Sequence, residues 1–299
     1  MIPVAFNPIY VLPLPENHRF PMEKYDLLHR QLIHEGTCEP EDFFSPATID
    51  YDSVIAIHQK VYVERLKDLK LNKAEIRKIG FPISQQLIDR EFIIAGGTLS
   101  GSLKALKSGL AFNIAGGTHH AFSSHGEAFC LLNDQAIAAQ YLLEKKLAKK
   151  ILIIDLDVHQ GNGTAEIFKK EDRVFTFSMH GKKNYPFKKE KSDLDIDLED
   201  KTNDKTYIEI LKEVLPKLLK NVKPDFIFYL SGVDILKSDR LGRLGVSIEG
   251  CKERDQMVLK YCHEEEIAVQ CSMGGGYSKD IKLIIEAHAN TYRVAKKIY

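Results

Sequence analysis

The 299-residue chain lacks the features that mark membrane, secreted and disulfide-rich proteins. No stretch approaches the roughly 18 uninterrupted apolar residues of a membrane span, so we expect none. Its first residues, MIPVAFNPIYVLPLPEN, have no basic region and are broken by prolines, which argues against a secretory signal peptide. The five cysteines include no C-x-x-C pair, and such a set is typical of reduced thiols inside a cell. We therefore expect a cytoplasmic protein, or a nuclear one in a eukaryote.

The chain also has no excess of charge of either sign. Its 42 basic residues balance 42 acidic ones, which argues against a nucleic-acid binder that depends on bulk charge. No G-x-G-x-x-G pattern is present at the glycine triplet 274–276, so we expect no dinucleotide-binding loop there. With 44% hydrophobic and 28% charged residues, the composition is typical of a soluble globular protein that buries a core without disulfides.

What the sequence does contain is an alternation of short apolar runs and longer segments with helical spacing. The predicted strands are residues 4–6, 53–57, 111–115, 151–154, 174–178, 226–230 and 267–271. The predicted helices are residues 24–34, most of 59–109 with a break at 80–82 and a weaker one at 96–97, then 134–147, 164–169, 205–221, 249–265 and 279–297. This order predicts one α/β domain over residues 1–299, with a mostly parallel central sheet and helices on both faces.

Residues suited to metal binding or proton transfer follow four of the apolar runs. In chain order they are His119 and His120 after residues 111–115, Asp155, Asp157, His159 and Asn162 after 151–154, Asp234 after 226–230, and Tyr277 after 267–271. In open α/β sheets, ligands bind outside the carboxyl ends of the strands. Polar residues scattered by chance would not prefer these ends, so we predict an active site at that edge of the sheet.

The spacing of Asp157 and His159 suits a metal ion. Residues two apart in extended chain face the same side, so a carboxylate oxygen and an imidazole nitrogen can reach one ion. Asp234 would supply a third ligand from another strand. Three nitrogen and oxygen ligands with an open fourth position describe a catalytic zinc site, although Fe(II) and Mn(II) accept the same ligand types. A single D-x-H pair is more often a turn or a surface pair, so the prediction rests on the convergence of several strand ends.

These same residues carry a family resemblance. The chain resembles the zinc-dependent histone deacetylase family, which has the arginase/deacetylase fold. The matching stretches, in the family's order, are GGTHHAFSSHGEAFCLLND (116–134), IIDLDVHQGNGT (153–164), RVFTFSMH (173–180), SGVDILKSDRLGRL (231–244) and MGGGY (273–277). Their specificity is high, and they cover most of the chain. The HQGNG form (159–163) is most similar to the class IV branch and its bacterial relatives.

The resemblance implies a role for the residues at the strand ends. It makes Asp157, His159 and Asp234 the ligands of one Zn²⁺ per chain, and His119 and His120 the tandem active-site histidines. In our interpretation His120 removes the proton of the attacking water. The same residue or His119 then delivers a proton to the leaving amine.

The resemblance also assigns supporting residues. Tyr277 would hydrogen-bond the substrate carbonyl and the developing oxyanion, and Asp155 would orient His119. Phe129 and Leu241 would form walls of an acyl-lysine tunnel. A structural K⁺ would be held by Asp155, Asp157, His159, Ser178 and Met179, partly through backbone carbonyls.

Three departures from the family pattern stand out. Asn162 replaces the aspartate that class I members have behind the second histidine, so the pKa of His120 should be raised less. Ala128 replaces a common glycine beside the tunnel phenylalanine, which puts the tunnel width in question. The segment GKKNYPFKKEK (181–191) has no clear match for the second tunnel aromatic, for which Tyr185 and Phe187 are candidates. This lysine-rich segment is also a candidate patch for an acidic partner.

The sequence therefore predicts a zinc-dependent amidohydrolase that removes an acetyl or longer acyl group from the Nε atom of lysine. Its partner would be an acyl-lysine protein or peptide, and an acetylpolyamine or another small acylated amine is the main alternative. A dinuclear manganese ureohydrolase would need carboxylates where Gly161 and Leu236 stand. A non-catalytic acyl-lysine binder is a further alternative, disfavoured because the ligand, histidine and tyrosine set is complete.

Overall fold

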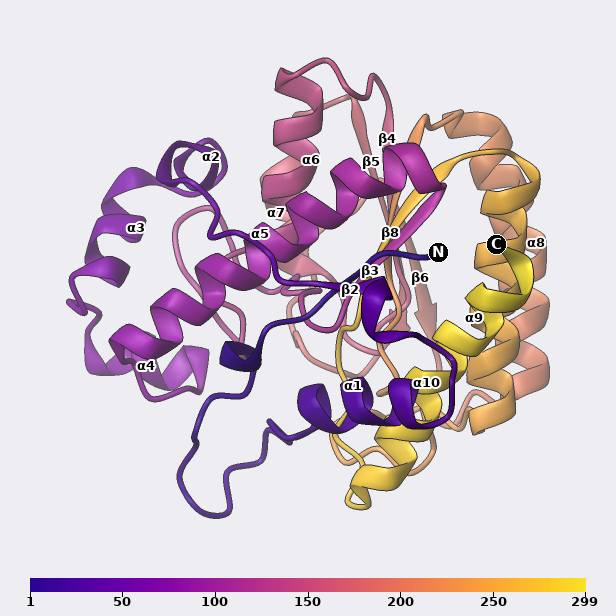
Figure 1. Ribbon diagram of the computed structural model, residues 1–299, viewed down its shortest axis with the longest axis horizontal. Coiled ribbons are helices and arrows are strands. Elements are labelled where there is room, and N and C mark those ends of the chain that lie inside the picture. The colour runs from indigo at the N-terminus through magenta and orange to yellow at the C-terminus, as the bar shows by residue number, and fades with distance from the viewer.

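Eight parallel strands form one central sheet in a computed structural model that describes residues 1–299 (Figure 1). Their order across the sheet is β2-β1-β3-β8-β7-β4-β5-β6. The strands are β1 (Val4–Ala5), β2 (Phe43–Phe44), β3 (Leu110–Asn113), β4 (Ile151–Asp155), β5 (Val174–Gly181), β6 (Leu194–Leu198), β7 (Phe226–Leu230) and β8 (Ala268–Ser272). Because parallel neighbours need crossover connections, most strands are joined through helices.

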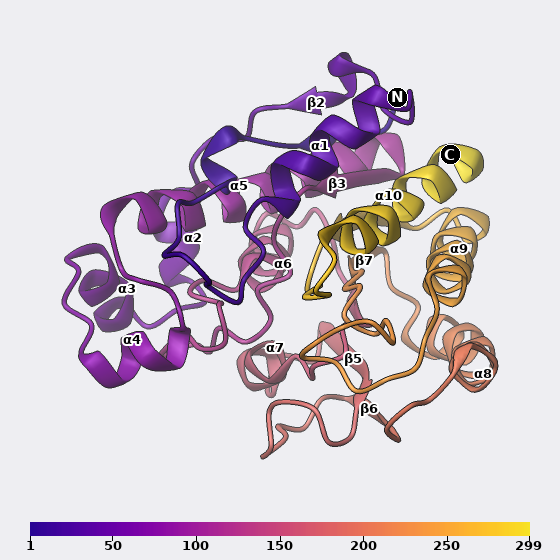
Figure 2. The same cartoon turned by 90° about the horizontal axis from the view of Figure 1, so that it is seen from below.

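The helices cover both faces of this sheet. They are α1 (Lys24–His34), α2 (Tyr51–Ile55), α3 (Lys60–Lys67), α4 (Lys73–Ile79), α5 (Gln85–Ser108), α6 (Asp134–Glu144), α7 (Asn162–Phe168), α8 (Asp204–Val222), α9 (Ile248–Glu264) and α10 (Ile281–Ile298), with short 3-10 turns η1 (Pro8–Tyr10) and η2 (Pro40–Asp42). Figures 1 and 2 show α5 and α6 on one side of the strands and α8 and α9 on the other. None of the helices is both long enough and apolar enough to span a membrane.

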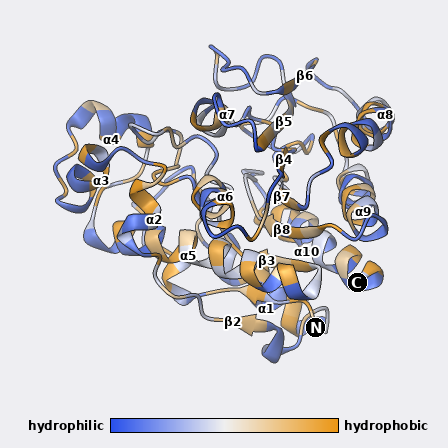
Figure 3. Cartoon of the chain, turned by 90° about the horizontal axis from the view of Figure 1, so that it is seen from above, coloured by the Kyte–Doolittle hydropathy of each residue, from blue (hydrophilic) through white to orange (hydrophobic).

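One hydrophobic core runs through the molecule. It joins 81 buried residues, and every residue of β4 and β7 is buried. Strands covered by helices on both faces read as continuous apolar runs, which is why these two were recognisable from the sequence. In Figure 3 the hydrophobic colours gather in the central strands, whereas α3, α4 and the loops near β6 are mainly hydrophilic.

Local capping signals fix where several helices begin. The side chains of Asn133, Asn203 and Ser247 accept hydrogen bonds from the backbone at the starts of α6, α8 and α9, respectively. A cap of this kind contributes about 1 kcal/mol to helix stability. Helix α6 starts at the end of the loop that carries His119 and His120, so its cap also helps to fix that loop.

The predicted α/β fold with helices on both faces is confirmed, and the sheet is wholly parallel. The predicted strand at residues 53–57 is wrong, because helix α2 occupies Tyr51–Ile55. The carboxylate of Asp50 accepts a hydrogen bond of 2.8 Å from the Ser53 backbone N–H and caps this helix. The apolar run at 54–57 lies over the end of this helix and the turn after it, with only Val54 buried, and a run this short cannot distinguish a helix from a strand.

Two other details of the secondary structure differ from the predictions. Helix α5 continues through Gly96 and Gly97 without a break. A Cβ atom at Gly96 would stand 1.9 Å from the Ala47 carbonyl oxygen, so this glycine permits close packing and does not interrupt the helix. Strands β2 and β6 have no counterpart among the predicted strands. They lie at the two edges of the sheet, and the β6 sequence LDIDL alternates apolar and acidic residues, as edge strands often do.

Candidate active site

The four strands whose ends carry the predicted site residues are neighbours in the sheet, in the order β3-β8-β7-β4. Their carboxyl ends therefore meet at one edge, and a cavity of about 720 Å³ opens there. Five of the residues predicted at the strand ends line this cavity: His119, His120, Asp157, His159 and Tyr277. The structure thus brings together residues that are up to 158 positions apart in the chain, from 119 to 277.

Asp157, His159 and Asp234 form a buried cluster at the inner end of the cavity. One ligand atom from each residue lies within 4.8 Å of the others. The His159 Nδ1 atom is 3.0 Å from an Asp157 oxygen and 3.1 Å from an Asp234 oxygen. Backbone N–H groups hold both carboxylates, because Gly275 donates to Asp157 at 2.8 Å and Val158 donates to Asp234 at 2.9 Å. Such outer hydrogen bonds orient ligands toward an ion.

The electrostatics of this cluster fit a divalent cation. Burial raises the pKa of Asp234 to about 7, and the nearby Asp157 carboxylate acts in the same direction. Burial opposes protonation of His159, but its hydrogen bonds to the two carboxylates outweigh burial and raise its pKa to about 10. The two carboxylates therefore stabilise a positive charge between them, and a proton on His159 is one source of that charge. A cation that replaces this proton satisfies the same carboxylates, and one imidazole with two carboxylates is a donor set that zinc accepts.

The tandem histidines differ in what holds them. The His119 Nδ1 atom donates to the Asp155 carboxylate at 2.7 Å, and the His120 Nδ1 atom lies 2.6 Å from the Asn162 amide oxygen. An amide oxygen accepts hydrogen bonds and cannot donate them, so Nδ1 of His120 carries its proton. In each ring the Nε2 atom is thereby left to accept or deliver a proton at the cavity. The two ring centroids are 4.1 Å apart.

These environments move the pKa values of the two histidines in opposite directions. Burial disfavours the charged form of His119, but the Asp155 and Asp157 carboxylates together outweigh burial and raise its pKa to about 8. Burial lowers the pKa of His120 well below its ordinary value, and the neighbouring His119 and His159 lower it further. The neutral Asn162 amide offsets these effects only in part. Groups whose pKa values are pushed apart in one site are suited to different proton-transfer roles.

Tyr277 follows β8 and is held from two sides through its backbone. Its N–H donates to the Asp239 carboxylate at 2.6 Å, and its carbonyl accepts a hydrogen bond of 3.0 Å from Arg240 Nε. Burial, followed by the charges of the Asp157 and Asp234 carboxylates, raises the pKa of the phenol well above its ordinary value. The hydroxyl therefore keeps its proton and can donate a hydrogen bond inside the cavity.

The predicted tunnel residues Ala128, Phe129 and Leu241 all line the cavity. Ala128 and Phe129 have positive φ angles of 48° and 68°, a conformation that favours glycine, which accounts for the glycine commonly found at the first position. The two candidates for the second aromatic are separated clearly. Tyr185 meets His120 edge-on with ring centroids 5.0 Å apart, whereas Phe187 is 91% exposed. Tyr185 is therefore the aromatic beside the histidines.

The residues predicted for a K⁺ site lie side by side on β4 and β5. Asp155 is paired in register with Ser178, and Met179 follows on the same strand. Asp155 accepts a hydrogen bond of 3.2 Å from the Asp157 backbone N–H. The hydroxyl of Ser178 lies 2.9 Å from the ring of His180. The potassium site stays a prediction.

Three charged residues near the site were missed by the sequence analysis. Arg254 on α9 is fully buried and donates to the carbonyl oxygens of Leu156, Gly232 and Ser231 at 3.2, 2.6 and 3.2 Å. These carbonyls belong to the turns that carry the candidate metal ligands. Nothing in the sequence marks Arg254, because a charged residue on a helix usually faces water.

Asp239 is the second missed residue, and its sequence context offered a signal. It lies inside the stretch SGVDILKSDRLGRL, five positions after Asp234. Its carboxylate accepts hydrogen bonds from the backbone N–H groups of Leu241 and Gly242 at 2.8 and 2.9 Å, in addition to that of Tyr277. Asp239 thus ties the tunnel wall at Leu241 to the tyrosine loop.

A buried lysine also lies beneath the tyrosine loop. Lys24 is fully buried, and its Nζ atom donates to the Gly274 carbonyl oxygen at 3.2 Å and lies 5.4 Å from the Tyr277 ring. Burial lowers the pKa of Lys24 to about 8, against the opposing effect of the Asp234 and Asp157 carboxylates. No sequence pattern indicates this contact, because Lys24 and Gly274 are 250 positions apart.

Comparisons with known proteins agree with this geometry. A family model described as the histone deacetylase domain matches residues 18–292. An uncharacterised protein of Picosynechococcus sp. is 43% identical over 297 residues, which cover 99% of this chain and 99% of that protein. Acetoin utilization protein AcuC of Staphylococcus aureus is 30% identical over 88% of this chain and 73% of its own length. Histone deacetylase 2 of Arabidopsis thaliana is 27% identical over 90% of this chain and 72% of its own length.

A solved structure shows the same fold. The crystal structure of the HDA15 HD domain superposes with a TM-score of 0.83 at 21% identity, covering 99% of this chain and 88% of that one. At this level of identity the likeness concerns the arrangement of the sheet and its helices.

Proposed function

Because this chain belongs to the histone deacetylase family, we propose that it is a zinc-dependent hydrolase that removes an acetyl or longer acyl group from the Nε atom of lysine in a protein or peptide. The observation that carries the proposal is the convergence of a buried two-carboxylate, one-imidazole cluster with two histidines and a tyrosine in one cavity. Each of these groups has a distinct place in the hydrolysis of an amide.

Asp157, His159 and Asp234 would hold the zinc ion. When bound, zinc supplies Lewis-acid polarisation of the amide carbonyl and makes water more acidic. Three protein ligands are the number found in catalytic zinc sites. The backbone donors at Gly275 and Val158 hold the two carboxylates in place.

His120 is the residue best suited to remove the proton of the attacking water. Its low pKa keeps the ring neutral, and the Asn162 amide fixes the proton on Nδ1, so Nε2 is free to accept. His119 has the raised pKa and the Asp155 partner of a group that is protonated near neutral pH. It would deliver the proton to the leaving amine of lysine.

Tyr277 would donate its hydroxyl hydrogen bond to the oxyanion that forms on the substrate carbonyl. Phe129, Leu241 and Tyr185 would enclose the apolar stem of the acyl-lysine and keep bulk water away from the reacting bond. Within this arrangement, Asp239 and Arg240 position Tyr277 through its backbone.

Hydrolysis of a set of Nε-acyl-lysine peptides, from acetyl to myristoyl, tests this proposal. Zinc-loaded protein should release the free lysine peptide, and the preferred acyl length would report the depth of the tunnel. His120→Ala should abolish turnover, and Lys170→Gln, on the surface between α7 and β5, is a control that should behave as the unchanged protein. A failure to cleave any of the peptides, with zinc bound in stoichiometric amount, would contradict lysine deacylation.

A further inference from the structure

The outer part of the cavity is strongly basic. Five exposed basic side chains line it, and we call them the mouth: Arg19, Lys78, Lys183, Arg240 and Arg243. The only acidic residues in the lining are Glu127, which is buried, and Asp157 in the candidate metal cluster. Since the chain has no net charge, this excess of positive charge is a local property of the mouth.

Only part of this charge is neutralised within the protein. Arg243 pairs with Asp200 at 2.6 Å, and Lys78 pairs with Glu127 at 3.3 Å. The Nζ atom of Lys183 is 3.9 Å from the same Asp200 carboxylate, which already serves Arg243.

Arg19 and Arg240 form no ion pair at all. Arg240 spends two of its N–H groups on backbone carbonyls, those of Tyr277 at 3.0 Å and of Arg19 at 3.3 Å. The Arg19 guanidinium lies over the Phe129 ring, 4.9 Å from its centroid. Two guanidinium groups without carboxylate partners are therefore fixed next to the tunnel wall. Glu16, three positions before Arg19, is exposed but does not line the cavity.

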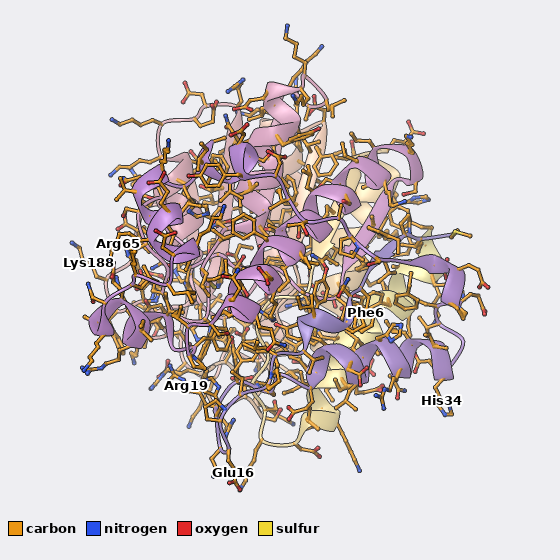
Figure 4. The ribbon with its side chains drawn as sticks, turned by 60° about the vertical axis from the view of Figure 1, so that its left-hand side comes forward. Phe6, Glu16, Arg19, His34, Arg65 and Lys188 are labelled. Atoms are coloured by element: carbon orange, nitrogen blue, oxygen red, sulfur yellow. The ribbon has the colours of Figure 1, made fainter.

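The lysine-rich segment extends the mouth on another side. Of its lysines, Lys182 pairs with Glu199 at 2.8 Å, and Lys189 donates to the carbonyls of Asn184 and Pro186 at 2.6 Å each. Lys183 and the exposed Phe187 face the cavity. In Figure 4, Arg19 and Lys188 are labelled on the side of the molecule that is turned forward, with both side chains at the surface.

We propose that the mouth selects acyl-lysine peptides in which acidic residues flank the modified lysine. The proposal rests on the proposed lysine deacylase function and names the kind of substrate for that same cavity. Carboxylates on either side of the acyl-lysine would meet Arg19, Arg240 and Lys183. Their guanidinium and ammonium groups donate hydrogen bonds and pair with carboxylates. A basic tail of the kind found on histones, or an acetylpolyamine, would bring further positive charge to an uncompensated basic rim and is disfavoured by repulsion.

The test compares three acetyl-lysine peptides that differ only in their flanking residues, which are glutamates, glutamines or lysines. We expect kcat/KM to be about tenfold higher for the acidic peptide than for the basic one at low salt, because exposed ion pairs each contribute a few-fold. The ratio should fall toward one near 0.5 M salt, where screening acts over a few ångströms. Arg19→Gln and Lys183→Gln should each lower the acidic-to-neutral ratio by about 1.5- to 2-fold, and the matched control Lys170→Gln should leave it unchanged.

The outcomes separate this proposal from the one on which it rests. Equal kcat/KM values for the three peptides, or a preference for the basic one, would overturn selection of acidic substrates while lysine deacylation still stands. Loss of cleavage of every peptide and of a short uncharged acetyl-lysine amide would overturn the proposed function itself. Free Nε-acetyl-lysine and its α-amide form a fourth comparison. A large preference for free Nε-acetyl-lysine over its α-amide, with no effect of the residues that flank the acyl-lysine in peptides, would overturn the assignment of a peptide substrate. It would identify a small molecule with a carboxylate as the substrate.

Discussion

The candidate metal ligands and the mouth of the cavity are built in different ways. Asp157, His159 and Asp234 are buried and follow central strands, and backbone N–H groups hold the two carboxylates, whereas the mouth consists of exposed side chains on loops and helix ends. Lys183, for example, has 61% of its side chain exposed. The first arrangement fixes geometry, which amide hydrolysis requires. The second can change without disturbing the sheet, and such loops commonly set substrate preference on a rigid scaffold.

The largest effect that would test this difference is expected at Asp234. Asp234→Ala should remove a ligand and lose both zinc and turnover, by more than the roughly 10–100-fold that loss of a supporting hydrogen bond to a ligand costs. Asp234→Asn, which keeps the shape and an acceptor for the Val158 N–H, separates loss of charge from loss of packing. Metal content and peptide hydrolysis measure the two effects. Stoichiometric zinc in Asp234→Ala would remove Asp234 from the ligand set.

A large loss of stability is expected at Arg254, which lies behind the candidate metal ligands. Arg254→Met leaves the buried Asp255 carboxylate without its partner, 2.7 Å away in the intact protein, and frees three carbonyl oxygens. Removing one member of a buried ion pair typically lowers the free energy of unfolding by about 3–5 kcal/mol. Denaturant unfolding measures this change. Arg254→Lys keeps the positive charge but loses the forked donors of the guanidinium, so its free energy of unfolding should lie between those of the unchanged protein and Arg254→Met. An unchanged unfolding midpoint in Arg254→Met would show that the contacts of Arg254 contribute nothing to stability.

Tyr277→Phe should separate catalysis from metal binding. The change removes one hydroxyl and keeps the ring that packs against Phe20 and Phe129 with centroids 5.9 and 6.0 Å away. Loss of one oxyanion donor costs about 100- to 1,000-fold in kcat. Zinc content should stay stoichiometric, because Tyr277 is not among the proposed ligands. Full activity in this variant would show that the tyrosine does not stabilise the transition state.

The clustering of Asp157, His159 and Asp234 could be predicted from the sequence because it follows from short spacings and from strand ends, while their role as metal ligands stays a prediction. Asp157 and His159 are two positions apart at the end of a buried strand, and the strand-end rule placed Asp234 and Tyr277 at the same edge. Neighbouring positions of β3, β8, β7 and β4 in the sheet could not be read from the sequence alone, but the family resemblance implied this fold.

The residues that were missed depend on contacts between distant parts of the chain. Arg254 looks like any charged residue on a helix, and only the packing of α9 against the sheet shows that it points inward. Of the mouth, only Lys183 lay in the lysine-rich patch noted from the sequence. Arg19, Lys78, Arg240 and Arg243 come from three other segments, which no spacing in the sequence connects. The wrong strand at residues 53–57 has a similar cause, since a capped helix of five residues is too short to show a period.

A smaller and more selective effect is expected at Asn162, beside His120. Asn162→Asp places a carboxylate where the amide oxygen now lies 2.6 Å from the ring, and a neighbouring carboxylate raises a histidine pKa. A general base works in its neutral form, so activity is lost as the pH falls through its pKa. The acidic limb of the kcat/KM profile should therefore move to higher pH by about one unit or more. An unmoved limb in Asn162→Asp, with normal zinc content, would show that His120 is not the group that titrates there.

The smallest effect is expected at Phe187, which we compare with Tyr185, an aromatic residue that lies deeper in the same cavity. Tyr185 lies beside His120, and its hydroxyl donates to the Glu127 carboxylate, whereas Phe187, two positions later, is 91% exposed at the mouth. Phe187→Ala should change kcat/KM for a short acetyl-lysine amide by less than about twofold, since exposed side chains away from the reacting groups contribute little. Its effect should appear, if at all, in KM for longer peptides that reach the mouth. Tyr185→Ala opens the wall next to the proposed base and should lower kcat for both kinds of substrate. If Phe187→Ala instead reduced kcat for the short amide as strongly as Tyr185→Ala, the mouth would take part in the chemistry, and the separation of catalysis from substrate selection would not hold.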